Sequence, residues 1–299
     1  MNKPTVWSRL RKDRVSYLML APYLTLFIVF TVVPVLYSIA LSFTSYNLLE
    51  APRFVFLENY RALFLHDEVF MKALQNTLII AVITGPVSYA ACFLLAWMIT
   101  DFPRIPRAIL TTVFYVPSVS GAVFMIWSIM FSSDSYGYIN AILTGLGLLN
   151  DPVQWLEDSR YVLAVVIIVS LWLSLGTSFL SFIAGLQNID RSLYEAGAVD
   201  GVTNRWQELW YITLPSMKPQ LMFGAVMQIT AAFGTGDVSA RLAGLPSVDY
   251  AAHTIVNHIM DYGYTRFEMG YASAVAVILF IMMVGSNKLV QKMLRKVGT

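Results

Sequence analysis

Residues 161–189 read YVLAVVIIVSLWLSLGTSFLSFIAGLQNI, a run of 29 residues without a single Asp, Glu, Lys or Arg. About 20 apolar residues in a helix are enough to cross the hydrocarbon core of a membrane, because each residue adds about 1.5 Å and the helix satisfies its own backbone hydrogen bonds. The run therefore predicts a transmembrane helix, which we place at 161–186.

Five more charge-free stretches, of 18 to 35 residues, occur along the chain, and they predict further transmembrane helices at 17–43, 76–100, 108–131, 217–240 and 269–289. The composition agrees, since 57% of the residues are hydrophobic and only 13% are charged, whereas soluble domains carry about 25% charged residues. We expect an all-α membrane protein with six transmembrane helices.

The distribution of Lys and Arg predicts the orientation, because positive charge is retained on the cytoplasmic side. The segment 1–16, the turn at 101–107, the loop 187–216 with Lys218, and the tail 291–299 with Lys288 hold 14 of the 20 Lys and Arg residues. Both termini are therefore expected in the cytoplasm, with one membrane domain over 17–290. The same distribution explains the net charge of +2, so no nucleic-acid partner is expected.

A secretory signal peptide is the alternative interpretation of the first apolar run, with Ser38-Ile39-Ala40 as a small-residue cleavage site. The run is far longer than the 7–15 residues of a signal core. We therefore interpret it as a membrane span.

The cytoplasmic loop 187–216 carries the pattern of two short helices. Ser192 followed three residues later by Glu195 has capping-box spacing and predicts the first helix start, and Gly201 suits the left-handed position that ends that helix. Asn204 is a candidate cap for the second helix, and Pro215 is expected to open the next membrane span.

The second predicted helix has an apolar face at helical spacing, formed by Trp206, Leu209 and Trp210. The expected product is a helix–turn–helix on the cytoplasmic surface, with this face turned toward a partner. A helix that lies on the lipid surface has the same pattern, so both interpretations stand.

Three parts of the loop resemble the Glu-Ala-Ala loop of importer permeases of the ATP-binding-cassette (ABC) class: Glu195-Ala196-Gly197, Asp200-Gly201 and the segment 212–215. The resemblance implies a coupling loop that docks on a separate nucleotide-binding subunit. The docking residues it implies are Glu195, Ala196, Gly197, Asp200, Gly201, Trp206, Ile212, Leu214 and Pro215. The sequence departs from the family pattern at Gly197, where Ala is common, and by one additional residue between Gly201 and Ile212.

The resemblance extends over nearly the whole chain and is strongest to sugar permeases of the maltose and glycerol-phosphate type. It rests on the segments 21–23, 57–60, 76–77, 185–187 and 270–273, together with Pro34 and 42–43. It implies a permease subunit in a bacterial plasma membrane, surrounded by lipids. Its implied partners are a second permease, two ABC ATPase subunits and an extracytoplasmic binding protein that delivers a sugar or oligosaccharide.

No Gly-x-x-x-x-Gly-Lys-Ser/Thr phosphate loop occurs in the sequence. We therefore expect no cofactor on this chain and no catalysis by it, with ATP and Mg on the partner subunit. Two rivals remain: an ion-coupled secondary transporter, which would use buried charges and inverted repeats, and a membrane enzyme, which would need a cluster of catalytic groups. Neither pattern is evident.

Five residues are candidates for the substrate passage: Phe233, Thr235, Asp237, Tyr115 and Trp172. Aromatic faces and small polar groups suit carbohydrates, and an acid near the membrane interior is a functional candidate. Core packing or anchoring at the membrane interface explains the same residue types. No metal site is expected, because His253 and His258 are five residues apart and lack a third ligand at metal spacing.

Glycine and proline interrupt several predicted spans, as at Gly121, Gly176 and 234–236. Such residues serve close helix packing or break a helix beside a water-filled cavity. Of the two, we expect close packing. Cys92, the only cysteine, is expected to pack as a small apolar residue, and no internal disulfide is possible.

Overall fold

The computed structural model describes residues 14–295, and it is helical. Within this described part of the chain, five continuous or nearly continuous helical segments are long and apolar enough to span a membrane: Arg14–Leu41, Glu68–Thr100, Val162–Gln187, Lys218–Ala243 and Met269–Leu294. A sixth candidate span is a pair of helices, Arg104–Val119 and Val123–Met130, bent by 82°. The all-α membrane fold is confirmed, but the third span is not the continuous helix that we predicted at 108–131.

The elements of the membrane part run in the order α2 (Arg14–Phe27), η1 (Ile28–Val32), α3 (Val33–Leu41), α5 (Glu68–Thr100), α6 (Arg104–Val119), α7 (Val123–Met130), α9 (Val162–Leu173), α10 (Thr177–Gln187), α14 (Lys218–Phe233), α15 (Gly236–Ala243) and α17 (Met269–Leu294). Connecting elements are β1 (Thr44–Ser45), β2 (Arg53–Phe54), α4 (Glu58–Leu65), α8 (Tyr138–Gly145), α11 (Arg191–Val199), α12 (Arg205–Glu208), η2 (Leu209–Thr213), α13 (Leu214–Ser216), η3 (Val248–Tyr250), α16 (Ile255–Met260) and η4 (Asp261–Thr265). The small antiparallel ribbon of β1 and β2 was not predicted.

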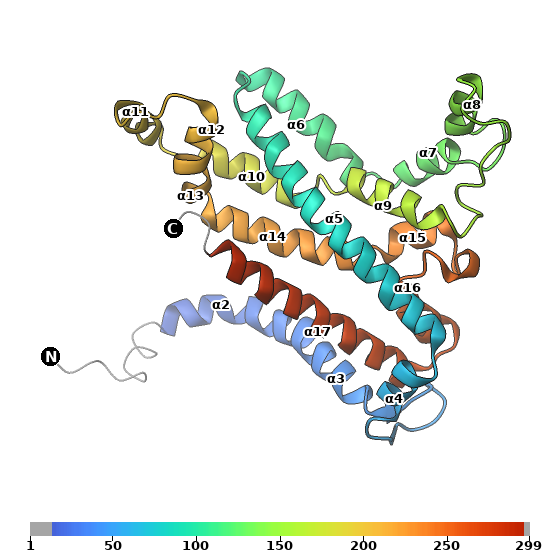
Figure 1. Cartoon of the computed structure of the whole chain (residues 1–299). Coiled ribbons are helices and arrows are strands. Elements are labelled where there is room, and N and C mark those ends of the chain that lie inside the picture. The colour runs from blue at the N-terminus through green and yellow to red at the C-terminus, as the bar shows by residue number, and fades with distance from the viewer. Residues whose placement is uncertain (1–13, 296–299) are drawn as a thin grey trace.

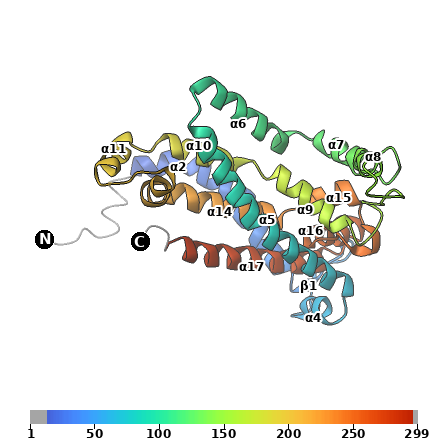
Figure 2. The ribbon, with the colours of Figure 1, turned by 45° about the horizontal axis from the view of Figure 1, so that its top comes forward.

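The centre of the molecule is a packed trio of helices, α5, α10 and α14 (Figures 1 and 2). Phe182 of α10 lies edge-on to Phe93 of α5, with ring centroids 5.7 Å apart. A side chain at Gly224 of α14 would meet the Phe182 ring at 2.4 Å, so this glycine is what allows α14 to approach α10 so closely. Cys92 is fully buried in the same cluster, as expected of a small apolar residue.

Two spans contain a break at the glycines noted in the sequence. The span Val162–Gln187 changes from α9 to α10 around Gly176, and the span Lys218–Ala243 changes from α14 to α15 at Gly234 and Thr235. In the bent pair, Ser120 adopts an extended conformation that ends α6 just before Gly121. The expectation that these glycines serve close packing was therefore wrong at Gly121, Gly176 and Gly234. It holds at Gly236, where a side chain would collide with Val256.

The two described ends of the chain lie on one side of the molecule. The start of α2, the end of α17 and the helices α11 to α13 gather at the left of Figure 1, whereas α4, α8 and α16 lie at the right. This arrangement agrees with an even number of crossings. The predicted N-terminal segment 1–16 falls mostly outside the described residues, as does the end of the predicted tail 291–299.

Candidate functional site

The loop between α10 and α14 forms the predicted helix–turn–helix, but its first helix begins earlier than expected. The side chain of Asp190 accepts a hydrogen bond from the Ser192 amide at 3.0 Å and caps α11. The predicted capping box of Ser192 and Glu195 is therefore wrong. A carboxylate at this place also interacts favourably with the positive end of the helix dipole, so Asp190 is the better cap. Glu195 is left exposed on the helix surface.

The turn between the two loop helices follows the prediction. Gly201 has φ of +92°, a conformation that favours glycine, and no atom of the described residues lies within 4 Å of the place of a Cβ. The Val202 amide then donates to the Gly197 carbonyl at 2.9 Å. Asn204 accepts from the Gln207 amide at 2.9 Å and caps α12, as predicted.

The second loop helix extends through η2 and α13, and the membrane span follows with α14 at Lys218. Pro215 therefore lies before the span and does not open it; Pro219 occupies the first turn of α14. The predicted apolar face is divided as well. Leu209 is buried in the core, whereas Trp206 and Trp210 are each 67% exposed. Leu209 and Trp210 both belong to η2, which winds as a π-helix and is wider than an α-helix.

Contacts between the two loop helices fix their relative position. The Tyr194 hydroxyl and Thr213 Oγ1 are hydrogen-bonded at 2.9 Å. A Cβ at Gly197 would lie 2.5 Å from Ile212 Cδ1, so Ile212 packs directly on the glycine backbone. This contact explains why this chain has glycine at position 197, where the family pattern commonly has alanine.

The residues predicted to dock fall into two groups. Glu195, Ala196, Asp200, Gly201 and Trp206 are exposed. Those that are partly buried, and shape the loop from within, are Gly197, Ile212, Leu214 and Pro215. The first group forms the outer surface of the loop.

A cavity of about 140 Å³, with several polar side chains in a mainly apolar lining, lies inside the membrane part, where the two broken spans meet α5. Its lining includes Thr84 and Ser88 of α5, Ser170 and Ser174 near the first break, and Gln228, Gly234 and Thr235 near the second. Gln228 Nε2 donates to the Ser174 carbonyl at 3.2 Å and to Cys92 Sγ at 3.1 Å. The hydroxyls of Ser88 and Ser170 are buried and have no hydrogen-bond partner among residues 14–295.

Of the five predicted passage residues, only Thr235 lines this cavity. Phe233 is buried against Ala81 and Ile229, on an apolar groove between α5, α14 and α17. Asp237 is exposed and pairs with Arg241 one turn away on α15, at 2.9 Å. Tyr115 is partly buried on α6. Trp172 is 42% exposed and lies edge-on to Trp127.

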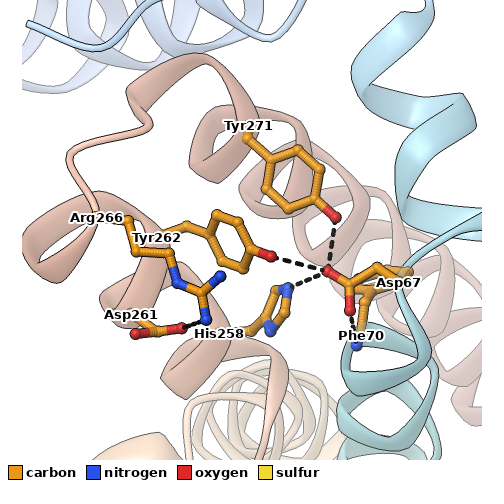
Figure 3. A network of polar contacts seen from close by, with 7 residues as sticks. All are labelled: Asp67, Phe70, His258, Asp261, Tyr262, Arg266 and Tyr271. Carbon is orange, nitrogen blue, oxygen red and sulfur yellow. Dashed lines mark hydrogen bonds and ion pairs between the residues drawn. The ribbon is translucent and has the colours of Figure 1, made fainter.

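At the opposite end of the molecule from the loop (Figure 1), a buried polar network joins the start of α5 to α16 and α17 (Figure 3). Asp67 caps α5 by accepting from the Phe70 amide at 2.8 Å. Its Oδ2 also accepts from the Tyr271 hydroxyl of α17 at 2.7 Å and lies 3.1 Å from His258 Nε2 of α16. The Tyr262 hydroxyl donates to the same oxygen at 3.4 Å.

Charge states in this network are shifted by burial and by hydrogen bonds. Burial alone would raise the pKa of Asp67, but the bonds from His258, Tyr271 and the Phe70 amide outweigh it and hold the pKa well below its usual value. Burial, with His258 close by, lowers the pKa of His253 to about 4. The rings of His253 and His258 are 5.6 Å apart. They touch despite their spacing of five, because His253 precedes the cap Thr254 of α16.

Sequence reasoning missed this network. The available signal was Asp67, an N-cap residue type just ahead of a long apolar run. Within residues 14–295, no group of three or more His, Cys, Asp or Glu side chains is arranged to hold a metal ion.

Comparison with known proteins places the chain in a family. The model for "Binding-protein-dependent transport system inner membrane component" matches residues 93–296. The chain is 33% identical to the probable ABC transporter permease protein YesP of Bacillus subtilis, over 91% of this chain and 88% of that protein. It is also 33% identical to the lactose transport system permease protein LacF of Rhizobium radiobacter, over 74% and 72%.

The fold has a solved counterpart in a bacterial ABC transporter involved in the import of the acidic polysaccharide alginate. The TM-score is 0.77 at 24% sequence identity, with 98% of this chain and 99% of that chain covered. Together, this fold and the family match explain the broken spans and the loop 187–216. This chain belongs to the inner-membrane components of binding-protein-dependent transport systems, the permeases of ABC transporters.

Proposed function

We propose that this chain forms half of the translocation path of an ATP-driven importer for a sugar or oligosaccharide. The observation that carries the proposal is the loop 187–216, whose exposed surface holds Glu195, Asp200 and Trp206 on a framework fixed by internal contacts. A rigid projection with an exposed tryptophan and acids suits docking to another protein. The docking partner is a nucleotide-binding subunit.

The complete transporter has two permeases, of which this chain is one, two copies of an ABC ATPase subunit and an extracytoplasmic binding protein. In this orientation the loop and both chain ends face the cytoplasm, with 1–16 and 291–299 outside the membrane domain 17–290. The described ends gather beside the loop, which supports this orientation (Figure 1). The external segments 44–75, 132–160 and 241–268, which together hold 11 Asp and Glu residues, then face the binding protein.

The hydroxyl and amide groups that line the cavity support a carbohydrate as the transported substrate. Sugar hydroxyls are both donors and acceptors, and the cavity offers the unpartnered hydroxyls of Ser88 and Ser170 beside Gln228 and Thr235. Helix breaks beside it let backbone groups face the lumen without meeting lipid. The lactose permease among the relatives is consistent with this substrate class. The cavity thereby replaces Phe233, Asp237, Tyr115 and Trp172 as the centre of the proposed passage, and Thr235 remains part of it.

ATP hydrolysis in this family belongs to a separate subunit, so the chain is a permease and not an enzyme, and it binds no cofactor of its own. Closure of the ATPase subunits moves the docked loop and shifts the membrane helices from inward-open to outward-open. The shift needs only a few kcal/mol of differential nucleotide binding between the two states. An ion-coupled secondary transporter, the rival interpretation, is set aside by the family match.

Co-purification in detergent tests the proposal. The chain is expressed with the products of its neighbouring genes, as wild type and as the variants Glu195→Ala and Gly201→Asp. We expect the ATPase subunit to be lost from both variants while the second permease is retained. Glu157→Ala, an exposed acid outside the loop, is the matched control and should retain the ATPase subunit and the second permease. Full recovery of the ATPase subunit with both loop variants, or no ATPase subunit with wild type, would overturn the docking role.

A further inference from the structure

Arg205, the first residue of α12, contacts the end of a helix that lies about a hundred residues earlier in the chain. Its guanidinium lies over the indole ring of Trp97 on α5, 4.1 Å from the ring centroid. Its Nη2 donates to the Trp97 carbonyl at 3.1 Å. The same nitrogen forms an ion pair with Asp101, the C-cap residue of α5.

The stacked ring is held from both sides. Trp97 packs against the central core cluster, and the Trp206 ring lies 5.2 Å from it on the loop side. The ion pair contributes less, because the side chains of Arg205 and Asp101 are 44% and 57% exposed and solvent screens the charges. The contact therefore depends on a flat cation that stacks and donates at once, which Arg provides and Lys does not.

The chain itself connects the loop only to α10, which precedes it, and to α14, which follows it. Arg205 adds a connection to α5, and through Asp101 to the turn that leads into α6. The sequence showed this turn only as a reversal of the chain at 101–107. In the structure it is a partner of the loop, beside a polar pocket of about 240 Å³ lined by Trp97, Asp101 and Arg205 with five others.

We propose that Arg205 is a positioning residue that locks the coupling loop to the cytoplasmic end of α5, so that movement of the docked loop moves α5 and the start of α6. The inference rests on the proposed function, since it assigns a path to the movement that the ATPase subunit delivers. It assigns no contact between Arg205 and ATP, substrate or the ATPase subunit.

Two fluorescent reporters on the complete transporter in lipid test the inference without a known substrate. One reporter is attached at Ile105→Cys, 73% exposed in the first turn of α6, and the other at Ser216→Cys, an exposed position at the end of the loop. The native Cys92 is fully buried, so the chain without an introduced cysteine measures background labelling. The parent chain for each comparison carries the reporter cysteine and no other change. A non-hydrolysable ATP analogue with Mg²⁺ is the probe.

Both reporters should respond to the analogue in the parent chain. With Arg205→Lys or Trp97→Leu, the Ser216 response should persist while the Ile105 response falls about two- to fivefold, the factor that corresponds to loss of one partly exposed cation–π contact. Trp97→Phe, which keeps a ring, should restore part of it. Arg191→Lys, the same change at an exposed position of the same loop, is the control and should alter neither reporter.

The outcomes separate this inference from the proposed function. No Ser216 response in the parent chain contradicts docking itself. A Ser216 response with no Ile105 response in the parent chain, or an unchanged Ile105 response in Arg205→Lys and Trp97→Leu, overturns the positioning role alone. Equal loss at both reporters in Arg205→Lys also overturns the positioning role, because Arg205 would then only maintain the fold of the loop.

Discussion

His258 Nε2 lies 3.1 Å from Asp67 Oδ2, which joins α16 to the first turn of α5 across 191 residues of sequence (Figure 3). The Asp67 side chain is 10% exposed and that of His258 is 1% exposed. With Tyr271 bonded to the same carboxylate, one residue holds three elements of the external end together. This relationship makes Asp67 the first position to test for stability.

Asp67→Asn should lower the free energy of unfolding by about 1–3 kcal/mol, because the donors that face the carboxylate lose a charged acceptor. Asparagine is itself a good N-cap, so the helix start is kept and the effect reports the network. Thermal unfolding of the purified protein in detergent measures the change. Glu68→Gln removes an adjacent, exposed acid from the same helix end and should change the midpoint little; equal effects of the two variants would count against the network.

Stability should fall as the pH is lowered from about 6.5 toward 4. The pKa of buried His253 is about 4 in the folded protein and about 6.5 when unfolded, so in this window the unfolded chain binds more protons and acid favours it. The contribution of His253 is at most about 3 kcal/mol. Asp67 acts in the same direction at lower pH, since its pKa is lowered by folding and its stabilisation is lost on protonation.

Thermal midpoints of wild type and His253→Phe between pH 4.5 and 8 check this expectation. Phenylalanine keeps a ring against Tyr250 and His258 but has no proton to bind, so the slope should flatten. His66→Phe, at an exposed histidine, is the control and should leave the slope unchanged. An identical slope in His253→Phe would show that other groups cause the acid sensitivity.

The fold was largely predictable because its main signal, the absence of charge over the length of a membrane span, is local in sequence. The ends of the membrane spans were less predictable from the sequence. The predicted start at 76 missed two turns of α5 that begin at Glu68, since polar residues continue the helix beyond the apolar run. The bend between α6 and α7 was also missed, because apolar composition persists through Gly121 while the backbone turns.

The loop shows the same division between local and tertiary information. Gly201 and Asn204 act through their own backbone neighbourhood, and both were predicted correctly. The burial of Leu209 and the exposure of Trp210 depend on which side of the helix faces the core. Periodicity placed both side chains on one apolar face, and this was wrong. The Arg205–Trp97 stack and the Asp67 network join residues more than a hundred positions apart, and no spacing rule reveals such pairs.

Gly197→Ala should weaken the loop, because the new methyl group would lie 2.5 Å from Ile212 Cδ1. The isoleucine tip can turn away, so we expect about 1 kcal/mol, the low end for overpacking. Recovery of the ATPase subunit and the thermal midpoint should both fall slightly. Ile212→Val in the same chain removes the colliding atom and should restore both. An additive loss in the double variant would contradict the packing explanation.

Gly201→Ala should destabilise the loop through the backbone alone, because φ is +92° and no neighbouring atom lies within 4 Å. The expected cost is about 1–2 kcal/mol. Gly201→Asn should be milder, since asparagine tolerates the left-handed region better than alanine. Limited proteolysis of the loop in the assembled complex measures the difference, and greater protection of the alanine variant would refute the conformational argument.

The cavity between the broken spans yields a prediction that separates stability from transport. Ser88→Ala and Ser170→Ala remove buried hydroxyls that have no hydrogen-bond partner in the described part of the chain. Removing an unsatisfied buried group is neutral or stabilising, so the thermal midpoint should stay the same or rise. If these hydroxyls serve passing sugar, uptake of a radiolabelled disaccharide panel by cells should nevertheless fall several-fold for every sugar that wild type takes up.

Ser128→Ala, whose hydroxyl bonds its own helix at Phe124, is the control outside the cavity and should transport normally. Normal uptake in both cavity variants would leave the hydroxyls without a role in transport, and a fall in uptake matched by a fall in stability would point to structure instead of substrate contact.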